Sequence, residues 1–204
     1  KVFVETCPHY LLLDESYVEK FGAYAKCNPA LRKKEEVEKL WDYVLDGTVD
    51  FIGSDHSPYL VSEKDKLDKN GNKDIFLSPA GFPGIDLRLP LMLTEAKKGR
   101  VSMERVVELL CVNPAKCFNI YPQKGTISAG ADADLVIVDM GHEHTFQAKD
   151  SYSQARDTMK VFEGWRLGCS VDYTVVRGRV VVENGVVDES AAGWGQMVTP
   201  NKKG

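Results

Sequence analysis

Two short apolar runs that end in polar motifs constrain the fold of this chain more than any other feature. Residues 2–4 lead into Pro8 and His9, and residues 49–53 lead directly to Asp55. Proline cannot donate to a strand ladder, so it ends the first run and places His9 just beyond a predicted strand. Both runs predict strands that end at a polar group.

A helix is predicted between these strands. Residues 35–45 carry apolar side chains at helical spacing, and Gly47 stands where a C-terminal cap is expected. Residues 23–27 predict a further short strand. The alternation of strand and helix is typical of a parallel sheet in an α/β fold.

The next segments are a predicted loop and two predicted helix starts. Residues 64–73 are rich in Lys, Asp, Asn and Gly, which predicts a mobile loop over the strand ends. The leucine-dense segment 85–93 follows. Ser102 is expected to cap one helix, and Asn113, followed by a proline, is expected to cap another.

Beyond residue 125 the pattern changes to short strands. Asn184 and Gly185 predict a tight hairpin turn between two of them. We therefore divide the chain into residues 1–122 and residues 123–204, the second part being a small β module with a surface tail. The predicted strands of this module are 135–138, 173–176, 179–183 and 186–187.

Charge and cysteine content exclude several classes of function. The net charge is −4, from 26 basic and 30 acidic residues that are interspersed, so nucleic acid and anionic membranes are not expected partners. The five cysteines form no C-x-x-C pair, which argues against a disulfide framework or a zinc knuckle and favours a cytoplasmic protein. Cys7, Cys27, Cys111 and Cys117 lie in apolar surroundings and are expected to pack rather than react.

His9 and Asp55 are the sharpest candidates for chemistry. Each follows a predicted strand, as metal ligands do at the C-terminal face of a parallel barrel or sheet. The alternatives are a turn or supporting histidine and a turn-starting or helix-capping aspartate. Position alone leaves these alternatives open.

Six motifs in order resemble the cyclic amidohydrolases, the group of allantoinase, dihydropyrimidinase (hydantoinase) and dihydroorotase. Three resemble successive strand-end motifs of that family, one its closing helix, and two the return into its small β domain. Together they cover nearly the whole chain. The motifs are residues 5–11 (ETCPHYL), 26–32 (KCNPALR), 53–58 (GSDHSP), 113–118 (NPAKCF), 121–127 (YPQKGTI) and 130–137 (GADADLVI).

The resemblance implies the C-terminal part of a TIM-barrel hydrolase, about strands 6 to 8, with part of a small β-sandwich domain. It implies two divalent metals, usually zinc, bridged by a carboxylated lysine that this chain lacks. His9 matches the histidine after the sixth strand of that family, and Asp55 the aspartate after the eighth. The chain begins at Lys1 rather than Met, and we expect the remaining ligands upstream of it. A dimer or tetramer is expected of the intact protein.

The resemblance also implies a mechanism and substrate contacts. Zinc is held by imidazole and carboxylate, and it activates a hydroxide that attacks the ring amide. Asp55 is expected to be both metal ligand and general acid/base. Asn28 resembles a substrate-contact position, the alternative being an Asn-Pro turn. Ala80 and Gly81 fall in a loop expected to touch substrate, and Ala80 stands where hydantoinases often carry asparagine.

The substrate evidence is therefore divided. The sequence Ser-Asp-His-Ser-Pro is closer to allantoinases, whereas Asn-Pro-Ala-Leu-Arg is closer to dihydroorotases. We expect ring opening of allantoin or a related hydantoin or dihydropyrimidine, with dihydroorotase or an inactive scaffold of the same fold as alternatives. A free-standing half-barrel binding module is not expected, because it would expose apolar edges. Alone, the 204 residues are expected to hydrolyse nothing and to hold zinc poorly.

Other histidines are not expected to bind the catalytic metals. His142 and His144 form an H-x-H pair, but they follow a strand of the small β module and occur after the aspartate motif. His56 neighbours Asp55, and neighbouring strand residues point to opposite faces. Its role is left open.

Overall fold

Two short parallel strands lie at the centre of the first part of the chain. The computed structural model describes residues 2–201. Strand β1 (Glu5–Thr6) pairs with β2 (Phe51–Ile52) in parallel, Glu5 opposite Phe51 and Thr6 opposite Ile52. The first strand thus begins three residues later than the apolar run 2–4 predicts. The parallel pair confirms the expected strand, helix, strand order.

The strand predicted at residues 23–27 is wrong. The residue pattern predicts this strand between the strand that precedes His9 and the strand that precedes Asp55. Residues Gly22–Ala25 instead form the short helix η1, so β1 and β2 pair directly within this chain. The match of His9 to the sixth-strand histidine and of Asp55 to the eighth-strand aspartate stays a prediction.

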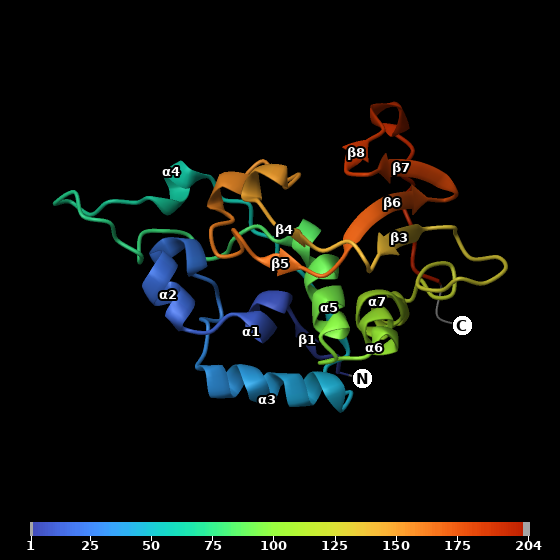
Figure 1. The fold of residues 1–204 in the computed structure, drawn as a ribbon, viewed down its shortest axis with the longest axis horizontal. Helices are drawn as coiled ribbons and strands as arrows, with labels where there is room; N and C mark the ends of the chain where they lie inside the picture. The colour runs from blue at the N-terminus through green and yellow to red at the C-terminus, as the bar shows by residue number, and fades with distance from the viewer. Residues whose placement is uncertain (1, 202–204) are drawn as a thin grey trace.

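Helix α3 (Lys34–Leu45) is the element that the sequence predicts best. Its buried side chains Val37, Trp41 and Val44 lie four and three residues apart, on one face. The indole of Trp41 donates to the carbonyl of Leu11, 2.8 Å away, so this face is fastened to helix α1 (Pro8–Leu12). Figure 1 shows α3 along one side of the molecule.

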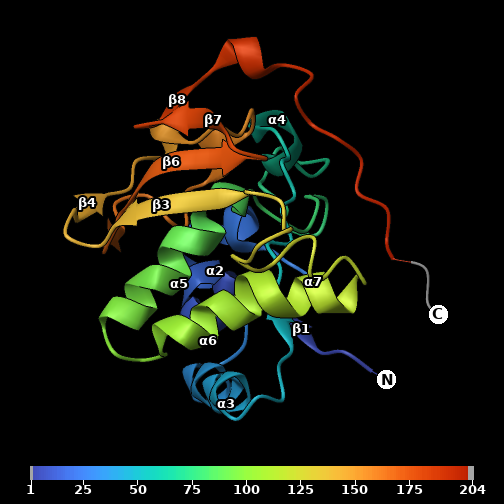
Figure 2. The same cartoon turned by 90° about the vertical axis from the view of Figure 1, so that its right-hand side faces the viewer.

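One long helical rod replaces two separate helices. Helix α6 (Met103–Val107), the π-helical stretch η3 (Glu108–Val112) and α7 (Asn113–Cys117) follow one another without a break (Figure 2). Ser102 caps the rod as predicted, accepting from the amide of Arg105. The second start is wrong, because Asn113 has helical dihedral angles and its side chain donates to the carbonyl of Asp50, 2.8 Å away.

The small β module is an antiparallel sheet in the order β3 (Leu135–Asp139), β6 (Ser170–Val176), β7 (Arg179–Glu183) and β8 (Val186–Val187). Asn184 and Gly185 both have positive φ, 47° and 78°, as the predicted hairpin turn requires. The sheet lies next to α5 (Arg88–Lys97) and the helical rod (Figure 2). A separate pair joins β4 (His144–Thr145) to β5 (Arg166–Leu167).

Two apolar cores hold the molecule together, and both cross the division predicted at residue 122. Phe146 and Phe162 pack with Leu13 in one core. Cys169 packs with Trp41 and Ile52 in the other. The segment between the small strands thus returns to the first part of the chain.

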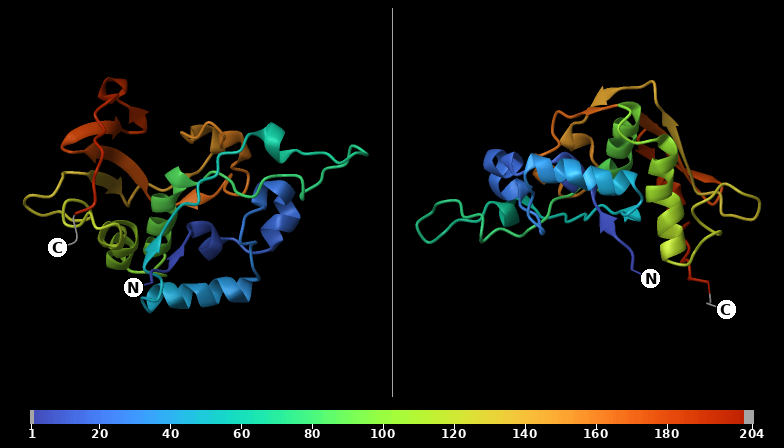
Figure 3. Two further views of the ribbon diagram at one scale, coloured as in Figure 1. Left: turned by 180° about the vertical axis from the view of Figure 1, so that it is seen from behind. Right: turned by 90° about the horizontal axis from the view of Figure 1, so that it is seen from below.

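The remaining elements are short. The predicted mobile loop is irregular between Asp65 and Ser78 and extends away from the body (Figure 3), but Lys64 at its start is only 1% exposed, against expectation. No helix within residues 2–201 is long and apolar enough to cross a bilayer. The short helices are α2 (Ser16–Phe21), α4 (Val61–Lys64), η2 (Ile85–Leu87), η4 (Ala148–Asp150), η5 (Arg156–Thr158) and η6 (Glu189–Ala191).

Candidate active site

Asp55 lies three residues beyond the end of β2 in an unusual backbone conformation. Its φ of 47° is in the left-handed region, which aspartate tolerates better than most residues. Such a conformation costs on the order of 1 kcal/mol and is found preferentially at functional sites. The side chain is 45% exposed. The loop therefore presents an accessible carboxylate at the carboxyl end of the strand pair.

His9 points its ring nitrogen toward this carboxylate. It is the second residue of α1 and is 5% exposed. Its Nε2 has no hydrogen-bond partner within the described residues 2–201 and lies 4.0 Å from Asp55 Oδ2, too far for a hydrogen bond. The rings of Tyr10 and Phe82 lie 4.0 and 5.2 Å from its centroid.

The surroundings of His9 keep its imidazole neutral. Burial lowers the pKa of His9 to about 4, since few polar groups replace the water that would stabilise the charge. A neutral imidazole with a free nitrogen can act as a metal ligand or a hydrogen-bond acceptor.

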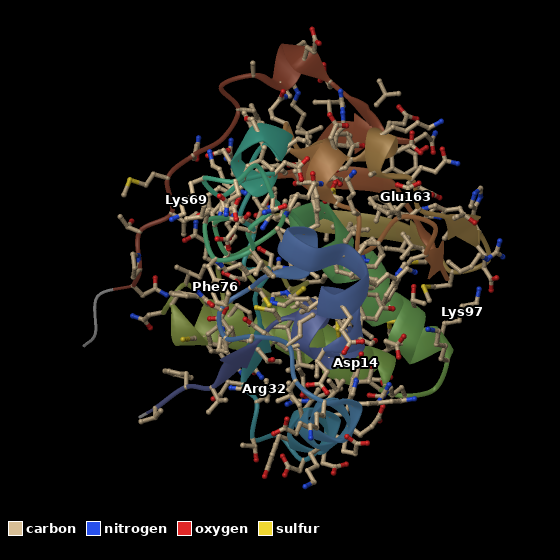
Figure 4. The ribbon with its side chains drawn as sticks, turned by 90° about the vertical axis from the view of Figure 1, so that its left-hand side faces the viewer. Asp14, Arg32, Lys69, Phe76, Lys97 and Glu163 are labelled. Atoms are coloured by element: carbon tan, nitrogen blue, oxygen red, sulfur yellow. The ribbon has the colours of Figure 1, made fainter. Side chains whose placement is uncertain are left out.

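A cavity of about 440 Å³ opens beside the two residues. Asp55 and Asn28 both line it, so the structure brings together two of the predicted site residues. Tyr10 also lines it and donates to the carbonyl of Pro29, 3.1 Å away. The other lining residues are Glu5, Thr6, Cys7, Leu13, Pro29, Ala30, Arg32, Glu36, Val37 and Leu40. Figure 4 labels Arg32 near α3.

Ala80 and Gly81, the other predicted substrate contacts, are not among the residues that line this cavity. The amide of Gly81 donates to the carbonyl of Lys26, 2.7 Å away. A Cβ added at Gly81, whose φ is 117°, would lie 2.6 Å from Ser57 Oγ. The Ala80–Gly81 segment therefore packs between residues 26–28 and the loop that carries Asp55.

The other histidines have separate surroundings. His56 Nδ1 accepts from the amides of Gly84 and Ile85, at 3.2 and 3.3 Å, and so fixes the backbone at the start of η2. His142 and His144 line a different cavity, of about 590 Å³, between α5 and the small sheet. The structure thus gives His56 a structural role and places the H-x-H pair in a cavity separate from that of Asp55.

Sequence reasoning missed two lining residues, Cys7 and Tyr10. Burial is the largest cause that raises the pKa of both side chains, that of Cys7 to about 12, and the charge of Asp55 adds to it. Both belong to the motif that contains His9, so the motif itself was the available signal. Taken singly, a cysteine such as Cys7 and an aromatic residue such as Tyr10 do not indicate a polar site.

The chain matches known proteins along most of its length. The model of the amidohydrolase family matches residues 11–181. The sequence is 40% identical to an L-hydantoinase of Paenarthrobacter aurescens over 97% of this chain and 39% identical to an allantoinase of Rubrobacter xylanophilus over 99%. A dihydroorotase of Acetivibrio thermocellus is 37% identical over 92%.

Solved structures agree with these matches. The L-hydantoinase from Arthrobacter aurescens superposes with a TM-score of 0.80 at 38% identity over 91% of this chain. A dihydropyrimidinase from Brevibacillus agri gives 0.81 at 32% identity over 91%. The chain spans about two fifths of its relatives' length, 42% of each of the three curated proteins and 40% of each of the two structures.

Proposed function

Because the chain belongs to the amidohydrolase family, we propose that it is part of an enzyme that opens a ring by hydrolysing a cyclic amide. The observation that carries the proposal is the placement of Asp55, which lines a cavity with Asn28 and faces the free nitrogen of His9. Relatives named hydantoinase, allantoinase and dihydroorotase align across this region.

Asp55 is proposed as metal ligand and general acid/base, and His9 as a second ligand. The fit is that of a partial site: an imidazole nitrogen and a carboxylate converge, but within residues 2–201 no three His, Cys, Asp or Glu side chains could hold a metal ion together. A catalytic zinc takes three protein ligands. We expect the others to lie outside these 204 residues.

The proposed chemistry divides between the metal and this chain's residues. Zinc, the proposed metal, supplies activation of water for attack on an amide carbonyl. The Asp55 carboxylate takes the proton from the attacking water and delivers it to the departing ring nitrogen. Asn28, on the cavity wall, is proposed to orient the amide edge of the ring, and the Ala80–Gly81 backbone to support that wall from behind.

The role of His9 as a ligand has its own test, because its Nε2 lies 4.0 Å from Asp55 Oδ2 and the imidazole could instead position that carboxylate. In the full-length protein, His9→Gln keeps a polar side chain but loses the imidazole. If His9 is a ligand, the bound zinc measured by atomic emission falls by about half or more, because one of the two metal ions loses an imidazole ligand. Unchanged zinc with reduced turnover would make His9 a residue that positions Asp55.

The substrate is proposed to be allantoin or a related hydantoin or dihydropyrimidine. Dihydroorotate is the second candidate, because the dihydroorotase aligns nearly as well as the other relatives. The test incubates zinc-loaded full-length protein with allantoin, hydantoin, dihydrouracil and dihydroorotate and detects the ring-opened acid by mass spectrometry. Turnover of one of them, abolished by a chelator and restored by zinc, supports the proposal. Failure with all four would favour a catalytically inactive scaffold.

A further inference from the structure

Lys64 is a buried ammonium group that the proposed chemistry does not use. It is the last residue of α4 and is 1% exposed. Its Nζ donates to the carbonyls of Pro79 and Gly81, at 2.9 and 2.7 Å. Burying a charge is costly unless its hydrogen bonds are met, so this placement needs a reason.

A second lysine, Lys26, binds backbone carbonyls of the neighbouring residues. Lys26 Nζ donates to the carbonyls of Ile75 and Ser78, at 2.9 and 2.6 Å. The two ammonium groups therefore bind four carbonyls between residues 75 and 81. The ion pairs found within residues 2–201 include neither group, so backbone dipoles serve as their partners.

These contacts close the base of the 65–78 loop. The loop leaves the body after α4 and returns at Ser78, whose hydroxyl donates to the carbonyl of Lys64, 2.5 Å away. Figure 1 shows the loop reaching far from α4, and Figure 4 labels Lys69 and Phe76 on it. Lys64 thus joins the start of the loop to residues 15 and 17 positions ahead, in the segment that follows the loop.

Residues 79–82, which follow the loop, lie directly against the candidate active site. The amide of Gly81 donates to the carbonyl of Lys26, two residues before Asn28, and the carbonyl of Phe82 accepts from the amide of Ser57, two residues after Asp55, at 3.2 Å. The ring of Phe82 stacks edge-on against His9. A shift of residues 79–82 would therefore move the wall that carries Asn28 and the loop that carries Asp55.

Resting on the proposed function, we propose that Lys64, aided by Lys26, is a positioning residue for substrate binding: its ammonium sets where residues 79–82 lie against Asn28 and the Asp55 loop. Burial and the nearby charge of Lys26 lower the pKa of Lys64 to about 8. Either protonation state has N–H groups enough for the two carbonyls.

The experiment compares Lys64→Met with Lys66→Met in the full-length, zinc-loaded protein. Methionine fills similar space but donates nothing, and Lys66 is an exposed lysine of the same loop. For Lys64→Met we expect KM for the ring amide that the wild type turns over to rise about tenfold while kcat changes less than about threefold. For Lys66→Met we expect wild-type values.

Hydrogen exchange at the Gly81 amide gives a second readout that does not need activity. Lys64→Met should exchange this amide about tenfold faster or more, because its bond to Lys26 is no longer held in place. If Lys64→Met does not fold, Lys26→Met provides the same comparison. Wild-type exchange and unchanged KM would overturn the proposal. If the wild-type protein turned over no ring amide while Lys64→Met still exchanged the Gly81 amide faster, the proposed function would be refuted. The role of Lys64 in positioning residues 79–82 would remain supported.

Discussion

At the scale of single residues, Asp55 combines accessibility with a constrained backbone. Asp55→Asn keeps the shape and the left-handed conformation but removes the proton acceptor. We expect kcat of the full-length enzyme to fall by about 10³-fold, within the range for loss of a general acid/base group. Steady-state assays of the best ring amide would measure it.

Asp42→Asn is the matched control for this substitution. Asp42 is exposed on α3, so the same chemical change should leave kcat unaltered. A wild-type rate in Asp55→Asn would contradict the role assigned to Asp55.

Cysteine environments give a prediction that is independent of the proposed activity. Burial raises the pKa of Cys7 to about 12 and that of Cys27 to about 11; the pKa of Cys111 is raised as well, but Cys111 is exposed to the reagent whereas Cys7 and Cys27 are buried. Only the thiolate is alkylated, and at pH 8 a thiol with pKa 11 is ionised in about one molecule in a thousand. Iodoacetamide should therefore label Cys111 at least about tenfold faster than Cys7 or Cys27, as followed by peptide mass spectrometry.

The control for this labelling is the unfolded chain. In denaturant all thiols should react at similar rates, since burial no longer distinguishes them. Equal rates of Cys27 and Cys111 in the native protein would show that Cys27 is not buried as described.

At the scale of elements, the cap of α6 tests the contribution of one hydrogen bond. Ser102 Oγ accepts from the amide of Arg105, 3.1 Å away, and so satisfies a free donor at the helix start. Ser102→Ala should lower the free energy of unfolding by about 1 kcal/mol, measured by urea denaturation. Ser128→Ala, at an exposed serine in a turn, should change it by less than about 0.5 kcal/mol.

Elements whose signals are local were predicted well from sequence. Helix α3 was found because its apolar spacing alone identifies the buried face, and the Asn184–Gly185 turn because both residues accept positive φ. The strand expected at 23–27 was wrong, because a strand needs a partner, and the carbonyl of Lys26 instead accepts from Gly81. The second helix start was wrong because a cap motif cannot reveal that the preceding helix continues through it.

The candidate site shows the same limit. The nearness of His9 to Asp55 follows from two strand-end motifs, and the parallel pairing brings them together. Composition marked residues 64–73 as mobile, yet it could not indicate which lysine would find backbone carbonyls and become buried. Contacts between residues distant in sequence determine which residues line the cavity and where Ala80 and Gly81 lie.

At the scale of the whole molecule, a row of aromatic rings connects the later part of the chain to the site. Phe162 contacts Trp165 and Phe82 edge-on, with centroids 5.4 and 6.1 Å apart, and Phe82 contacts His9. Both cores contain residues from each side of position 122. We therefore expect one cooperative unfolding transition rather than separate melting of two parts.

Phe162→Ala tests this coupling. Phe162 is 2% exposed, so its truncation leaves a cavity and should lower the free energy of unfolding by about 3 to 5 kcal/mol, whereas Phe162→Leu should cost less because more of the volume remains. Phe76→Ala, at a ring that is 88% exposed, is the control and should change stability by less than about 0.5 kcal/mol. Urea unfolding followed by tryptophan fluorescence reports the transition, because Trp41 lies in one core and Trp165 packs against the other. Two separate transitions, or a loss at Phe162 as small as at Phe76, would show that the later segment only rests on the first part and does not complete its core.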